Sequence, residues 1–166
     1  VATLFENNIQ VGILSGDSQA TVNSIARQLH PHFSFGELLP NEKVDRLRKL
    51  RSDGKIVMMV GDGINDAPAL STADVGVALG SATDLTKENA DVTIIGTQLA
   101  KIPWLLNLGE RTYGIIQWNL FWAFSYNIVG TILAALGFLD PIIAACAMIG
   151  SSLFIIINSR RLSARR

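Results

Sequence analysis

The sequence has little cysteine and no excess of charge of either sign. Cys146 is the one cysteine among 166 residues, so the chain cannot close an internal disulfide bond and has no Cys-x-x-Cys pair. Basic and acidic residues number 14 each, and a net charge of zero argues against a nucleic-acid-binding protein. His30 and His32 have no evident third ligand, so a loop is favoured over a metal site there.

The N-terminus also lacks a secretion signal. Residues 1–5 carry no basic segment followed by a long apolar run. The chain starts at Val1 rather than at a methionine, and we therefore expect it to begin inside a larger reading frame.

Charge is nearly absent from the last third of the chain. Between Arg111 and Arg160 the sole charged residue is Asp140. An α-helix needs about 20 apolar residues to cross a bilayer, and we predict two such helices, at about 113–139 and 141–158. A buried hairpin of a soluble protein is the alternative, but two adjacent apolar runs of this length are rare in soluble domains.

Basic residues predict the orientation of this membrane region, which we place at 98–166. Lys101 and Arg111 precede the first predicted span, and four arginines follow the second, whereas the turn between the spans has no basic residue. Positive charge favours the cytoplasmic side. We therefore expect an integral protein of a bacterial inner or plasma membrane, with its soluble part and its C-terminus in the cytoplasm.

The first 97 residues alternate between strand and helix patterns. Apolar runs predict strands, and apolar residues at helical spacing predict the helices between them. Repeated strand–helix units of this kind indicate an α/β fold with a parallel sheet. The predicted strands are 11–14, 33–35, 56–60, 75–79 and 92–95; the predicted helices are 19–29, 65–70, a segment near 84–89, and one with Asn41 as its N-cap and Gly54 as its stop.

Acidic residues follow two of these strands. Asp17 comes after the first strand, and Asp62 and Asp66 come after the strand at 56–60. Parallel α/β sheets bind their ligands at the carboxyl ends of strands. One or two carboxylates together with a phosphate oxygen are a usual ligand set for Mg²⁺, so Asp62 and Asp66 are predicted magnesium ligands.

Neighbouring residues fit a phosphate at the same edge of the sheet. Gly16, Gly61 and Gly63 let the backbone approach a phosphate closely. Asn65 can donate a hydrogen bond to a phosphoryl oxygen, and Lys43 is a candidate counter-charge. A lone Gly/Asp pair is usually a turn, but so many polar and glycine residues directly after a buried strand favour a functional site.

The run Gly-Asp-Gly-Ile-Asn-Asp-Ala-Pro-Ala-Leu at 61–70 closely resembles the hinge motif of P-type ATPases. Three shorter segments resemble other motifs of that family: Ser15-Gly16-Asp17 its TGD segment, Pro40-Asn41-Glu42-Lys43 its PxxK segment, and Gly80-Ser81-Ala82-Thr83-Asp84 its GTGTD loop. The resemblance implies that residues 1–97 are part of a haloacid-dehalogenase-like phosphorylation domain. It also implies that Asp62 and Asp66 hold Mg²⁺, that Lys43 contacts an aspartyl-phosphate, and that domains outside this chain bind most of the ATP.

Polar residues interrupt both predicted spans. Tyr126 and Asn127 lie seven and eight residues after Asn119, so one helix face presents all three. Such groups usually face the interior of a helix bundle. They serve either an ion pathway or hydrogen bonds between neighbouring helices, and the sequence leaves both readings open.

The second span carries a methionine close to two serines. Ser151 and Ser152 lie three and four residues after Met148. A thioether is a ligand for soft Cu(I) rather than for Mg²⁺ or Ca²⁺. Tyr-Asn on one span and Met-x-x-Ser-Ser on the next resemble the copper subgroup of heavy-metal P-type ATPases, which implies that these residues form part of a Cu⁺ transport site.

Several parts of such a pump are missing, among them its nucleotide-binding domain and its actuator segment. The chain has no Asp-Lys-Thr-Gly-Thr phosphate acceptor, whose strand would lie centrally in the sheet, and no Cys-Pro-Cys segment. Cys146 is two residues before Met148, on another helix face, and is read as a packing residue. We therefore expect this chain to be inactive without the N-terminal part of the same pump.

The sequence thus predicts part of a pump that couples ATP hydrolysis to export of Cu⁺, with membrane lipid and the missing N-terminal part as its partners. Two alternatives stay open. One is a membrane-tethered phosphatase of the haloacid-dehalogenase class, which would need a nucleophilic aspartate upstream. The other is a truncated membrane protein without catalytic activity.

Overall fold

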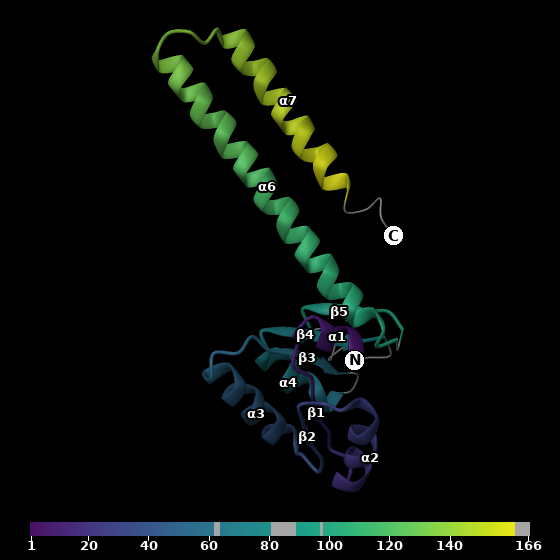
Figure 1. The fold of residues 1–166 in the computed structure, drawn as a ribbon. Coiled ribbons are helices and arrows are strands. Elements are labelled where there is room, and N and C mark those ends of the chain that lie inside the picture. Colours follow the sequence, from purple (N-terminus) through teal and green to yellow (C-terminus); the bar gives the residue numbers. More distant parts are fainter. Residues whose placement is uncertain (62–63, 81–88, 97, 162–166) are drawn as a thin grey trace. The chain divides into compact units, whose positions relative to one another are not determined.

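The computed structural model describes residues 1–61, 64–80, 89–96 and 98–161. These residues form two compact units, Val1–Lys101 and Ile102–Arg166. The first unit holds all the strands of the described residues, and the second holds two long helices (Figure 1).

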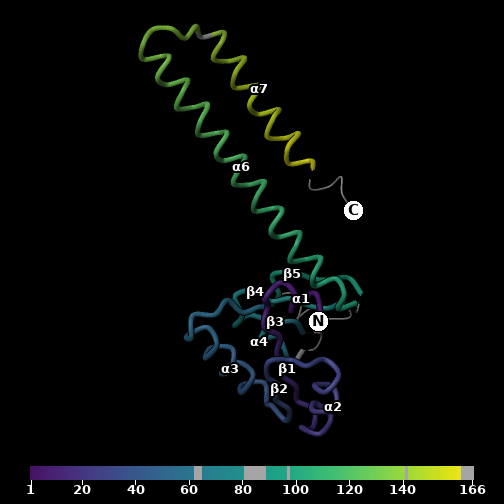
Figure 2. Tube along the Cα trace, viewed as in Figure 1, coloured from purple at the N-terminus to yellow at the C-terminus, as the bar shows by residue number. Residues whose placement is uncertain are grey.

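The strands of the first unit form two separate parallel sheets. One sheet pairs β1 with β2, and the other has the order β3-β4-β5. The helices α2, α3 and α4 connect or follow these strands, as the trace in Figure 2 shows. The bounds are α1 Ala2–Glu6, β1 Gly12–Leu14, α2 Gln19–Leu29, β2 Phe33–Phe35, α3 Pro40–Ser52, β3 Met58–Gly61, the 3-10 turn η1 Ile64–Asp66, α4 Ala67–Thr72, β4 Val75–Leu79 and β5 Val92–Ile94.

Most elements of this unit were predicted from the sequence, and the parallel α/β arrangement is confirmed. The assignment of Asn41 as the N-cap of α3 was wrong, because the helix starts at Pro40 and its N-cap is Leu39. Proline suits a first helical position, where no intrahelical partner exists for an N–H group. The Glu42 carboxylate accepts the Leu39 N–H at 2.8 Å and closes this end of the helix. Most of the helix predicted near 84–89 lies outside the described residues, and α1 was not predicted.

The core of the first unit lies where α3 and α4 cover the second sheet. Val44 and Leu47 of α3 pack with Met59 of β3 and with Leu70 of α4, which is fully buried. Leu14 of β1 packs against the same cluster, so both sheets share one core. The spacing of Val44 and Leu47 by three residues places them on one helix face, as the apolar pattern requires.

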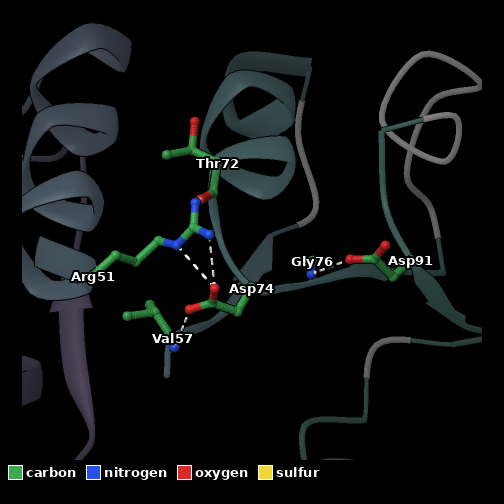
Figure 3. Close-up of polar contacts among 6 residues, drawn as sticks. All are labelled: Arg51, Val57, Thr72, Asp74, Gly76 and Asp91. Atoms are coloured by element: carbon green, nitrogen blue, oxygen red, sulfur yellow. Dashed lines mark hydrogen bonds and ion pairs between the residues drawn. The ribbon is translucent and has the colours of Figure 1, made fainter. Parts of the chain in front are cut away.

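The carboxylates of Asp74 and Asp91 bind backbone N–H groups beside β3 and β4 (Figure 3). Asp91 accepts the Gly76 N–H at 2.8 Å. Asp74 accepts the Val57 N–H at 2.9 Å and pairs with the Arg51 guanidinium at 2.8 Å. Arg51 also donates to the Thr72 carbonyl, so one side chain joins α3 to the end of α4. These contacts fix where β3 and β4 begin, and thereby where the glycine-rich end of β3 comes to lie.

The hydrogen bond from Val57, with the charge of Arg51, lowers the pKa of Asp74 below its ordinary value of 3.8, against a smaller opposing effect of burial. A lowered pKa in the folded state stabilises the fold above the unfolded-state pKa and is lost as pH falls through the folded value. Asp74→Asn should therefore lower the melting temperature at pH 7 and remove part of the stability loss below about pH 4. Thermal unfolding of the whole protein from pH 3 to 7 measures both. Asp45→Asn, which alters an exposed pair of 3.5 Å on α3, is the control; equal pH profiles for both variants would contradict this role.

The second unit is a helical hairpin made of α6, Lys101–Ala135, and α7, Pro141–Arg160. Asp140 caps α7 by accepting the Ile142 N–H at 2.8 Å. Among the described residues, one helix is long and apolar enough to cross a membrane, at Ile142–Arg160, with a mean hydropathy of 2.1. Polar side chains, such as the amides of Asn119 and Asn127, make α6 more polar than α7. The span at 113–139 stays a prediction.

Candidate functional site

The carboxyl end of β3 brings together three of the predicted site residues, Lys43, Gly61 and Asp66. Lys43 Nζ lies 2.7 Å from Asp66 Oδ1, and the two side chains are only 11% and 15% exposed. Lys43 comes from the first turns of α3, and Asp66 ends the turn that follows β3. The pair therefore joins the helix after the first sheet to the end of the second sheet.

Gly61 is required at this position. A Cβ on Gly61 would lie 2.8 Å from Asp66 Cβ and 3.0 Å from Asp66 Oδ2, closer than side chains tolerate. The glycine thus makes room for the Asp66 carboxylate beside the strand end. Asn65, the residue before Asp66, is exposed. Asp62 and Gly63, the other predicted residues of this run, lie outside the described residues.

The loop after β1 holds its acid in a tight turn. Ser15 Oγ donates to Asp17 Oδ2 at 2.9 Å, and the Asp17 N–H donates back to Ser15 Oγ at 3.1 Å. The Asp17 carbonyl accepts the Glu37 N–H at 2.6 Å, which ties the loop to the segment after β2. Gly16 lies between Ser15 and Asp17, and its Cα has room for a side chain. Within the described residues, the hydrogen bonds of Asp17 go to Ser15 and Glu37 rather than to the Lys43–Asp66 pair.

This end of the first unit suits a hard cation together with a phosphate. Carboxylate oxygen is the ligand type that Mg²⁺ takes, and the ammonium group of Lys43 supplies the positive charge that a phosphoryl group needs. No group of three or more His, Cys, Asp or Glu side chains that could hold a metal occurs among the described residues. The described residues thus offer Asp66 as a first ligand, which fits an ion that keeps several waters and shares a phosphate.

The predicted ion ligands in the hairpin are not joined by hydrogen bonds across its two helices. Asn127 Nδ2 donates to the Ala123 carbonyl at 2.7 Å, and Ser152 Oγ donates to the Met148 carbonyl at 3.0 Å, each within its own helix. Tyr126 is half-buried and Met148 is 56% exposed.

Ser151 differs from these residues. Its side chain is buried, and its Oγ is the one buried side-chain polar atom without a hydrogen-bond partner in the described part of the chain. A buried hydroxyl without a partner costs free energy, and Ser151 Oγ can still donate or accept a hydrogen bond.

Sequence reasoning missed Asn158 and Ser159. Asn158 Nδ2 donates to Asn119 Oδ1 at 2.8 Å, and Asn119 Nδ2 donates to Ser159 Oγ at 3.1 Å, so these residues bond α7 to α6. The available signal was an amide inside an apolar run, seven residues after Ser151 on the same helix face.

Residues 1–74, with acidic residues after β1 and β3 and a lysine between them, match a family model described as haloacid dehalogenase-like hydrolase.

Two curated proteins are similar to the chain over nearly all of its length. The chain is 45% identical over 165 residues to a probable copper-importing P-type ATPase A of Enterococcus hirae, covering 98% of the chain and 23% of that protein. It is 43% identical over 166 residues to a copper-exporting P-type ATPase of Staphylococcus aureus strain JH9, covering all of the chain and 21% of that protein. Over its whole length the chain is similar to a portion of these P-type ATPases.

A solved structure gives the same result. The crystal structure of a zinc-transporting PIB-type ATPase in the E2.Pi state aligns with a TM-score of 0.86 and 31% identity, over 97% of this chain and 27% of that chain. The chain thus spans about a quarter or less of the length of these relatives.

Proposed function

We propose that this chain is the part of a copper-transporting P-type ATPase that holds the phosphorylated site from one side and supplies part of the ion pathway. The Lys43–Asp66 pair at the end of β3 is the observation that carries the catalytic half. Relatives named as copper pumps support the choice of Cu⁺ as the ion.

In this proposal the pair changes partners during the cycle. Without a phosphoryl group, the Lys43 ammonium and the Asp66 carboxylate neutralise each other at 2.7 Å. When a phosphoryl group lies at the strand ends, Lys43 turns its charge toward the phosphoryl oxygens and frees Asp66 for the cation. Mg²⁺, when bound, supplies charge neutralisation for the phosphoryl group, and Asp66 with the predicted ligand Asp62 would hold it.

Three further residues shape the same site. Gly61 gives Asp66 the space that a side chain would fill. Asn65 is exposed beside the carboxylate and can donate a hydrogen bond to a phosphoryl oxygen. Asp17, held by Ser15 in its turn, presents its carboxylate after β1 and is proposed to act on the phosphorylated group from that strand.

We propose that residues 1–97 are an incomplete phosphorylation domain. The described strands form two sheets, β1-β2 and β3-β4-β5, that share one core although β1 and β3 are not paired. A strand bearing the phosphorylated aspartate, supplied by the N-terminal part of the same pump, would join them into one parallel sheet. ATP would be bound mainly by the domains outside this chain.

We propose that Tyr126, Asn127, Met148, Ser151 and Ser152 line part of the Cu⁺ pathway. The Met148 thioether provides a soft ligand, and the unpartnered Ser151 hydroxyl is buried on the same helix. Polar groups in an apolar helix face ion pathways in many membrane proteins. Lipid is the expected surrounding of the hairpin. Both of its ends are expected on the cytoplasmic side, because α7 ends at Arg160 and Arg161 follows.

Ion-stimulated ATP hydrolysis by the whole pump in membrane vesicles tests this function. We expect Cu⁺ to stimulate hydrolysis and Zn²⁺ to leave it near its basal rate. For export, inside-out vesicles should accumulate Cu⁺ when ATP is added outside. Equal stimulation by Zn²⁺ would contradict the choice of Cu⁺ as the ion. ATP-driven release of Cu⁺ from loaded inside-out vesicles would contradict export. ATP-driven transport by residues 1–166 without the rest of the pump would contradict the incomplete domain.

A further inference from the structure

The second helix of the hairpin buries two of its polar side chains and leaves most of its apolar ones exposed. Among the α7 side chains that the structure describes, the buried ones are Ser151 and Asn158, each 7% exposed. By contrast Ile142, Ile149 and Ile157 are 75%, 57% and 62% exposed. This distribution is reversed relative to a helix of a soluble protein, and it directs the polar face of α7 toward α6.

Three residues form what we call the amide clamp: Asn119 of α6 with Asn158 and Ser159 of α7. The Asn119 side-chain oxygen accepts a hydrogen bond from Asn158 Nδ2 at 2.8 Å, and its nitrogen donates to Ser159 Oγ at 3.1 Å. Asn119 thus uses both ends of its amide between the helices. Its partners are neighbours on α7, so a shift of one helix along the other breaks both bonds.

The clamp determines which residues of the hairpin lie at the same level. Three residues beyond Asn119, the ring of Trp122 lies 5.1 Å from the ring of Phe154, four residues before Asn158. Residues at the same height therefore have rising numbers along α6 and falling numbers along α7. This is expected for antiparallel helices, which lie side by side in Figures 1 and 2.

Tyr126 and Ser151 come to the same level by this rule. Tyr126 lies seven residues after Asn119, and Ser151 lies seven residues before Asn158. Seven residues are about 10.5 Å and nearly two full turns of an α-helix, so each residue also keeps the face of its clamp partner. The buried Ser151 hydroxyl without a partner thus lies level with the phenol of Tyr126.

We propose that the amide clamp is a positioning device: it fixes the register in which Tyr126 and Ser151 face one another across the ion pathway. The proposal rests on the proposed function of these two residues. Apolar packing alone specifies register weakly in lipid, because lipid tails contact an isoleucine as well as a neighbouring helix does. The clamp itself has no thioether, the soft ligand that Met148 supplies for Cu⁺, which favours positioning over ion binding there.

A distance measurement tests the register directly. Spin labels are placed at Ile116 and Ile156, both well exposed, in the full chain carrying Cys146→Ala in lipid nanodiscs. We expect one narrow distance distribution without further changes. Asn158→Leu should broaden it or move it by about 5 Å, one helical turn. Thr112→Val is the matched control, because Thr112 bonds a carbonyl of its own helix and should leave the distribution unchanged.

Ion activation of the whole pump tests the consequence. In Asn119→Leu/Asn158→Leu, two apolar groups meet, which keeps the hairpin stable because no buried polar group loses its partner. We expect a melting temperature near that of the unmodified pump, a half-saturating Cu⁺ concentration raised tenfold or more, and an unchanged half-saturating ATP concentration. A change in stability without a change in Cu⁺ dependence would reduce the clamp to a structural contact and overturn the proposal.

The two experiments separate failure of the clamp from failure of the proposed function. If Cu⁺ does not stimulate the unmodified pump, the copper function fails while the distance measurement still decides the register. If Asn158→Leu changes neither the width nor the mean of the distance distribution, the clamp does not set the register. That conclusion holds whatever ion the pump carries.

Discussion

Lys43→Met should abolish ATP-driven turnover of the whole pump, lowering its rate by a factor of roughly 100 or more, in line with the loss of one preorganised charge at a phosphoryl group. The methionine keeps the length of the side chain and removes its charge. The rate of ATP hydrolysis measures turnover. Transfer of labelled phosphate from ATP to the protein, resolved on a gel, measures phosphoenzyme formation. Lys49→Met, an exposed lysine on the same helix, is the matched control and should retain normal turnover.

The same variant has a second, separable effect. Lys43→Met leaves the Asp66 carboxylate, only 15% exposed, without its partner, which should destabilise the first unit by roughly 1–3 kcal/mol. Lys43→Met/Asp66→Asn removes both charges, and thermal unfolding of this double variant should return toward the unmodified value while turnover stays lost. Recovery of turnover together with stability would show that the pair is structural only.

The other large effect is expected at the methionine of α7. Met148→Ala should raise the half-saturating Cu⁺ concentration roughly 10- to 100-fold, because the substitution removes the soft thioether ligand. The assay compares half-saturating Cu⁺ concentrations for ATP hydrolysis by the whole pump. Ile149→Ala is the matched control, since Ile149 is 57% exposed beside Met148 at 56% and has no ligand atom. If both variants need the same Cu⁺ concentration as the unmodified pump, Met148 is no ligand.

Sequence reasoning located the strands and helices well where apolar spacing was decisive. The helix Gln19–Leu29 and the strands Phe33–Phe35 and Val75–Leu79 have the predicted bounds. The start of α3 was misplaced because a side-chain cap was weighed above the preference of proline for the first helical position. The short helix α1 has no buried residue, and therefore carried no apolar pattern to find.

The candidate site was predicted residue by residue, but not its internal pairing. The ion pair between Lys43 and Asp66 joins residues 23 positions apart, and only the packing of α3 beside β3 brings them together. In the hairpin, the absence of charge drew attention to the span and away from Asn158, whose uncharged amide makes the bond to Asn119. The available signal was its position seven residues after Ser151, on the same helix face.

The reversed polarity of α7 has a calorimetric consequence. Unfolding of the first unit exposes apolar groups such as Leu70 and Val77 to water and should carry the large positive heat capacity change of a soluble domain. Separating α7 from α6 in lipid would instead expose Ser151 and Asn158 to hydrocarbon, while the isoleucines stay in the surroundings they already have. That step should show almost no heat capacity change. Scanning calorimetry in nanodiscs would therefore distinguish the two units by the heat capacity change of each transition rather than by its temperature.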